Sequence, residues 1–125
     1  MNNIKKYDLE DRLVKFSILV LEVCDLLPAT KTGHNLEHQL SKSGTAPALM
    51  YGEVQAAESR ADFIHKMKQL LKELRETRVN LRIITEKPVI VHEKPGNALK
   101  ECNELIGIFS KSIETAKNNR IATSK

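Results

Sequence analysis

Three residues near the end of the first quarter of the chain have the spacing of a zinc-protease motif. His34, Glu37 and His38 form H-x-x-E-H, in which two histidines one helical turn apart bind zinc and the glutamate acts as a base. Such enzymes need a third ligand and a substrate cleft from a larger fold, and the chain offers only His65 and His92 as further imidazoles. We therefore interpret this motif as an exposed helix face.

Other catalytic patterns are weaker still. A di-iron bundle needs two Glu-x-x-His pairs and two further glutamates, whereas Asp62 and His65 form a single imperfect copy. Cys24 and Cys102 are far apart, form no CxxC motif, and have no predicted histidine neighbour, and no G-x-S-x-G elbow occurs. We therefore predict a protein that is not an enzyme, takes no cofactor or metal ion, and packs its two thiols reduced in the core.

Basic residues are concentrated in one segment, residues 60–86. This segment has seven basic and four acidic residues, a net charge of +3 in a chain whose net charge is +4. Helical spacing places the candidate nucleic-acid-binding residues on or beside one flank: Lys68, Lys72, Arg75, Arg78 and Arg82. Such a flank could contact phosphates, or it could be a solvated face or pair with acidic groups of another subunit. Each Phe lies on a predicted core stripe, so no stacking platform for bases is expected and binding would be directed at the backbone.

The elements that carry these residues are four amphipathic segments. Apolar residues recur at spacings of three and four, which predicts helices over residues 8–27, 33–58, 60–85 and 96–117. Asp8 and Ser59 are expected N-caps, and Pro28 and Pro88 are expected to close the first and third helices. Short connections between such helices predict an all-α fold, an antiparallel up-down-up-down four-helix bundle, as a single domain over residues 1–125.

The middle of the second helix is unusual because small residues and a proline occupy core positions. Ser43, Gly44 and Ala48 would let another helix approach closely, and Pro47 removes one backbone hydrogen bond, so we expect a kink near Ser43.

A second apolar set on the first helix indicates an interface. Val14, Ile18 and Leu21 fall away from the main stripe, so a single bundle core cannot cover them. Leaving them exposed would forgo about 1.5 to 3 kcal/mol of burial each, which favours a homo-oligomer.

Length and composition agree with a single cytoplasmic domain. The chain has 125 residues, 41% of them hydrophobic and 29% charged, with no Trp. No apolar run approaches the length of a membrane span and the N-terminus lacks the apolar core of a signal peptide, so we expect a cytoplasmic protein without a membrane partner.

An ordered series of motifs covers nearly the whole chain. It comprises RLVKF, LEHQL, SGTAPALMYGE, AAESRADFIHKMKQLLKELRET and ECNELIGIF. This series resembles the four-helix-bundle family named after proteins encoded in intervening sequences of 23S ribosomal RNA genes. The resemblance implies an antiparallel bundle assembled as a homopentamer, and a relative in diversity-generating retroelements works as a basic pentamer with a reverse transcriptase and nucleic acid. The chain departs from the family pattern at Met50, where Asn is common, and at Asn80, where an aromatic residue is frequent.

Two functional hypotheses follow from the residues and the resemblance together. The first is an oligomeric bundle that binds structured RNA or DNA through the basic flank. The second is a structural or adaptor oligomer that binds a protein partner and no nucleic acid.

Overall fold

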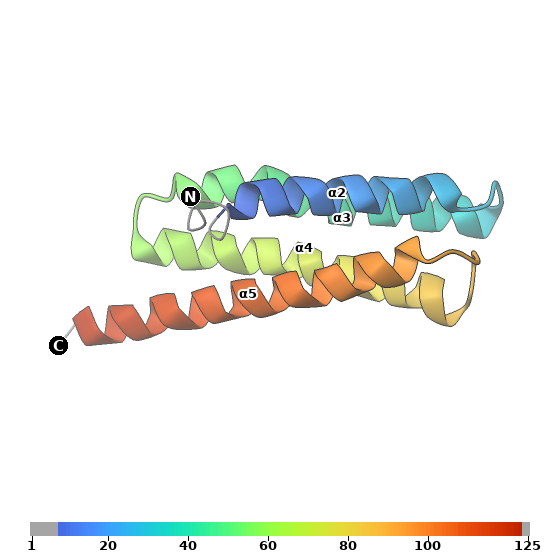
Figure 1. The fold of residues 1–125 in the computed structure, drawn as a ribbon. Coiled ribbons are helices and arrows are strands. Elements are labelled where there is room, and N and C mark those ends of the chain that lie inside the picture. Colours follow the sequence, from blue (N-terminus) through green and yellow to red (C-terminus); the bar gives the residue numbers. More distant parts are fainter. Residues whose placement is uncertain (1–7, 124–125) are drawn as a thin grey trace.

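The computed structural model describes residues 8–123, which form four helices. They are α2 (Leu9–Leu26), α3 (Lys31–Gln55), α4 (Arg60–Glu86) and α5 (Lys94–Thr123). Successive helices run antiparallel, and each contacts its two neighbours around the bundle, α2 and α4 both packing against α3 and α5 (Figure 1). No strand occurs in this part of the chain, and the predicted all-α four-helix bundle is confirmed.

Polar side chains fix where three of the helices begin. Asp8 accepts a hydrogen bond from the Asp11 backbone N–H at 3.0 Å, and Ser59 accepts one from the Asp62 N–H at 3.0 Å, as the sequence predicts for N-caps. Asp62 also accepts from the Glu58 N–H at 3.2 Å, which completes a variant of the capping box. Thr30 caps α3 through the Gly33 N–H, so α3 begins slightly earlier than predicted.

The core consists of the apolar stripes that the spacing predicts. Leu13, Phe16, Val20 and Val23 of α2 are buried, and the other helices contribute matching residues. The largest buried side chains of those helices are Leu40, Val54, Leu70, Leu74, Leu81, Ile84, Leu105 and Phe109. Phe63, expected on the core side of α4, is only half-buried, because Ile64 takes the buried position at that turn.

Helices α2 and α3 approach closely at Gly44. A Cβ atom at this position would lie 2.4 Å from Cγ1 of Val20, well inside van der Waals contact. The Ser17 hydroxyl also donates to the Gly44 carbonyl oxygen at 3.4 Å. The predicted close approach is therefore confirmed, and α3 remains an unbroken helix through Pro47.

Three ion pairs join α2 to α5. Arg12 donates to both carboxylate oxygens of Glu101 at 2.8 Å and to Glu104 at 3.1 Å. Nearer the other end of α2, Lys94 lies 3.5 Å from Glu22. These contacts join the first described helix to the last, which are neighbours in the bundle but not consecutive in the sequence.

The last helix is longer than the sequence predicts. We expected it to end at residue 117, but α5 continues to Thr123 and extends past the end of the bundle (Figure 1). The reason is that no Gly or Pro follows Gly107 to break the helical backbone. No helix within residues 8–123 combines the length and apolarity needed to cross a membrane.

Candidate nucleic-acid interface

Three of the five predicted basic residues lie around one groove between α4 and α5. Lys68, Lys72 and Arg75 of α4 line this groove, together with Lys117 of α5. The groove has a volume of about 560 Å³, and its floor includes the apolar side chains of Leu71 and Ile113. We call it the basic groove.

The four cations of the basic groove are available to an external anion. None of them forms a salt bridge with another residue in the range 8–123. The side chains of Lys68, Lys72, Arg75 and Lys117 are all exposed, and the one carboxylate among the lining residues is Glu114. The groove therefore carries an excess of positive charge that the described residues do not neutralise.

Arg78 and Arg82 lie outside this groove. Arg78 is half-buried and close enough to Cys102 for its charge to act on that thiol. Arg82 donates to Glu86 at 2.7 Å, and this hydrogen bond raises the pKa of its guanidinium. Arg82 shares a shallower groove with two exposed apolar residues of α4, Val79 and Ile83. The basic flank that helical spacing predicts is thus divided into two parts.

Lys117 was missed in the sequence because it falls at the predicted end of the fourth helix. In the structure α5 continues beyond Lys117 to Thr123, so this side chain lies within the helix. The signal that could have identified it is its spacing from Ile113, four residues earlier, which puts Lys117 one turn beyond a core position.

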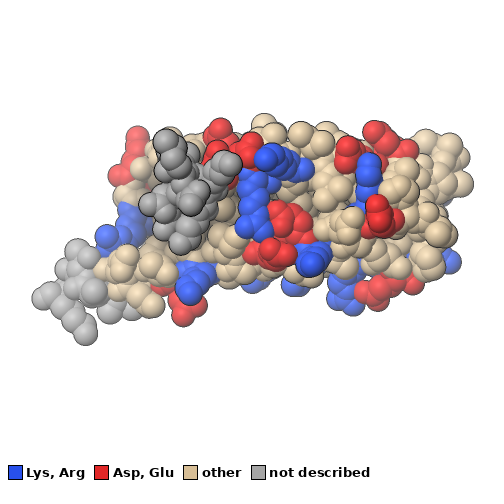
Figure 2. Space-filling model, viewed as in Figure 1, with Lys and Arg blue, Asp and Glu red and all other residues tan. Residues whose placement is uncertain are grey.

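The face formed by α2 and α5 has a different charge character. Figure 2 shows basic and acidic side chains interspersed over this face, with no large region of one sign. On this face Arg12 of α2 pairs with Glu101 and Glu104 of α5, one positive charge against two negative charges. A polyanion would therefore find less uncompensated charge here than at the basic groove.

The second apolar set of α2 lies on the surface. Val14, Ile18 and Leu21 are 44%, 51% and 43% exposed, respectively. Their spacing of four and three residues places them on one stripe of α2, away from the buried Leu13 and Val20. The structure thus leaves this stripe uncovered within the single chain.

The histidine motif and the two cysteines are the candidate residues for metal or thiol chemistry. His34, Glu37 and His38 are exposed on α3, and residues 8–123 contain no cluster of His, Cys, Asp or Glu side chains that could hold a metal ion. Both cysteines are free and buried. Burial raises the pKa of Cys24 to about 11 and that of Cys102 to about 12, so both remain protonated at neutral pH.

Comparison with known proteins finds similarity to solved structures. No protein-family model and no curated protein matches the chain. The fold is similar to the 1.70 Å crystal structure of a protein of unknown function from the S23 ribosomal protein family of Bacteroides thetaiotaomicron. The TM-score is 0.75 with 25% sequence identity, over 83% of this chain and 96% of that chain. This chain therefore shares an all-α four-helix bundle, over nearly the full length of that relative, with a protein of the S23 ribosomal protein family.

Proposed function

We propose that the chain is a member of the 23S ribosomal RNA intervening-sequence family, and that it is a non-enzymatic oligomeric bundle which binds the phosphate backbone of structured RNA or DNA. The observation that carries this proposal is the basic groove, where four cations from two helices face one open space and form no salt bridge within residues 8–123. The structural relative is assigned to the S23 ribosomal protein family, and that family name is compatible with an RNA ligand.

The dimensions of the groove suit a strand of nucleic acid. Lys68 and Arg75 are seven residues apart in α4, which corresponds to about 10 Å along the helix axis. A strand of B-form DNA places one phosphate about every 3.4 Å along its axis, so this length matches about three phosphates. Flexible lysines and an exposed arginine bind such phosphates mainly by charge, which gives affinity without base specificity.

The test measures affinity against salt concentration for a structured RNA and a duplex DNA. Each phosphate neutralised contributes about 0.9 to the slope of log K against log salt for duplex DNA. Replacing two cations, Lys72→Glu with Arg75→Glu, should weaken binding to all sequences alike and reduce the magnitude of that slope by about 1.8.

The matched control makes the same change of charge elsewhere. Lys31→Glu with Lys100→Glu alters two exposed lysines of α3 and α5 that lie outside the basic groove. It should weaken binding less and leave the slope nearly unchanged. Equal effects from the two double variants would contradict a site in the basic groove and leave only a general effect of net charge.

A second candidate function rests on Val79 and Ile83. These side chains are 50% and 46% exposed beside Arg82. Because they are apolar, they would make no favourable contact with a phosphate backbone. A protein partner with an acidic and apolar surface would fit them better, as in the adaptor hypothesis. Val79→Ser with Ile83→Ser should then abolish capture of that partner while nucleic-acid affinity is unaffected.

A further inference from the structure

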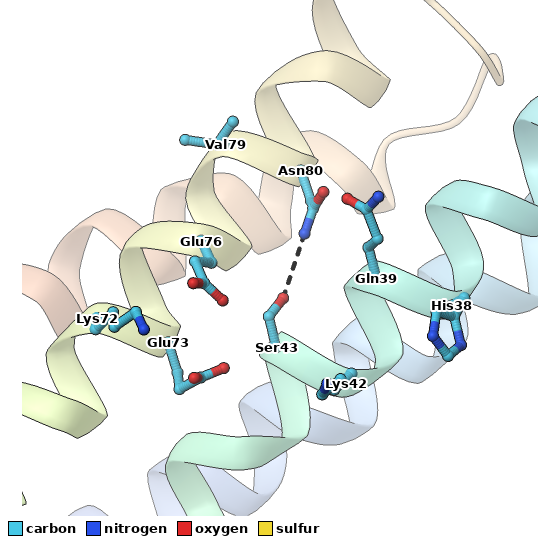
Figure 3. Close-up of a pocket in the computed structure, with 9 residues that line it drawn as sticks. All are labelled: His38, Gln39, Lys42, Ser43, Lys72, Glu73, Glu76, Val79 and Asn80. Carbon is cyan, nitrogen blue, oxygen red and sulfur yellow. Dashed lines mark hydrogen bonds between the residues drawn. The ribbon is translucent and has the colours of Figure 1, made fainter.

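A second groove lies between α3 and α4, on the other side of α4 from the basic groove. It has a volume of about 540 Å³, and its lining differs from that of the basic groove because it includes buried polar groups as well as charged ones (Figure 3). We call it the polar groove.

The floor of the polar groove is a hydrogen bond between two buried side chains. Asn80 is 6% exposed and Ser43 is 4% exposed, and the Asn80 Nδ2 donates to the Ser43 Oγ at 3.3 Å. An asparagine also has a carbonyl acceptor, which makes no hydrogen bond with the residues that the structure describes. Since no fully buried side-chain polar atom in this range lacks a partner, that carbonyl oxygen retains some solvent exposure, and Asn80 lines the groove.

Two carboxylates form the α4 wall. Glu73 and Glu76, one turn apart, both point from α4 toward α3 beside Ser43 (Figure 3). Neither carboxylate forms a salt bridge with another residue in the described range. Burial raises the pKa of Glu73, and the neighbouring charge of Glu76 raises it further, against smaller opposing effects of Lys72 and Lys42. This wall thus presents acceptors that lack a close cationic partner.

Cationic groups complete the lining. Lys42 of α3 and Lys72 of α4 are exposed, and neither forms a salt bridge within residues 8–123. Two ammonium groups and two carboxylates therefore line the same space and cancel in net charge. A dication would be repelled by both lysines and a dianion by both glutamates, so the lining favours a ligand whose own charges cancel.

We propose that the polar groove binds a small zwitterion of the amino-acid class. Its ammonium group would lie against the carboxylates of Glu73 and Glu76 and the carbonyl of Asn80, and its carboxylate against Lys42. This site is separate from the basic groove and does not depend on nucleic-acid binding, although Lys72 lines both.

The experiment is an amide NMR titration with a chain-length series of zwitterions. The probes are glycine, β-alanine, γ-aminobutyrate and ε-aminocaproate, with butylamine and butyrate as analogues that carry only one of the two charges. We expect chemical-shift changes in residues 38–43 and 72–80, and binding of one zwitterion about tenfold tighter than that of either analogue. Equal binding of butylamine would overturn the proposal in favour of a simple cation site, and no shift with any zwitterion would overturn it altogether.

Single-charge variants assign the two ends of the ligand. Glu76→Gln and Lys42→Gln, both at exposed positions of the groove, should each weaken the affinity for the zwitterion about tenfold. Glu53→Gln, at an exposed position of α3 outside the groove, should leave that affinity unchanged. Unchanged affinity in both groove variants would refute the assignment. Because Lys42 lines only the polar groove, Lys42→Gln should not alter the salt slope for nucleic acid, so the two proposals fail independently.

Discussion

Gly44 determines how closely α2 and α3 can pack. A methyl group at this position would lie 2.4 Å from Val20 Cγ1, and a β-branched valine has little freedom to move away. We expect Gly44→Ala to lower the free energy of unfolding by about 1 to 3 kcal/mol, despite the higher helix propensity of alanine, as measured by urea denaturation.

Gly52 offers a matched control in the same helix. Nothing lies within 4 Å of a Cβ atom built at this position, so Gly52→Ala should raise the free energy of unfolding by about 0.5 to 1 kcal/mol. If both substitutions stabilise the protein equally, the two helices are not in the close contact described above.

For single residues, the sequence predicted packing environments better than hydrogen-bond partners. Small residues around Gly44 indicated a close approach, and the approach is present. The hydrogen bond between Asn80 and Ser43 was not predicted, because periodicity assigns a residue to a face but not to a partner on another helix. The polar groove was missed for the same reason.

At the scale of the helices, the ion pairs between α2 and α5 are the contacts most open to measurement. Arg12 and Glu101 form a two-pronged pair whose side chains are 36% and 27% exposed, more protected than most surface pairs. Hydrogen bonding to Glu101 raises the pKa of Arg12, so the guanidinium keeps its charge at neutral pH. A double-mutant cycle of Arg12→Met and Glu101→Gln should give a coupling free energy of about 0.5 to 1 kcal/mol.

A pair within α2 serves as the comparison. Lys15 and Asp11 lie 3.0 Å apart at a spacing of four residues, with side chains 75% and 54% exposed. The same cycle on this pair should give about 0.3 to 0.5 kcal/mol. A coupling for Arg12 and Glu101 no larger than this would mean that their ion pair stabilises the bundle no more than an ordinary surface pair does.

Element bounds followed from the sequence wherever a cap or proline marks them. Asp8, Ser59 and Pro28 fixed three ends to within a few residues. The end of α5 could not be predicted, because nothing in its polar tail either caps the helix or breaks it. For the same reason, Lys117 and its contribution to the α5 side of the basic groove were not predicted.

At the scale of the whole molecule, the exposed stripe of α2 predicts assembly. Val14, Ile18 and Leu21 are about half-exposed, so covering them would gain about 0.7 to 1.5 kcal/mol for each side chain. We expect the wild-type protein to sediment as a closed oligomer, of five subunits if the family resemblance holds, and Ile18→Glu to shift it toward the monomer.

The control for assembly changes an exposed apolar residue elsewhere. Val91, in the connection before α5, is 98% exposed, so Val91→Glu adds the same charge without touching the stripe. It should leave the sedimentation profile unaltered. A wild-type protein that sediments as a monomer at micromolar concentration, or an Ile18→Glu profile identical to wild type, would exclude the stripe as the interface.

The buried thiols make this protein convenient for site-specific labelling. With a pKa of about 11, on the order of one Cys24 side chain in ten thousand is a thiolate at neutral pH, and Cys102 is still less reactive. A cysteine introduced on the surface would therefore react with a maleimide dye long before either native one. Fluorophores could be attached to the bundle without first removing its own cysteines, and the slow labelling of Cys24 and Cys102 would itself report how often the core opens.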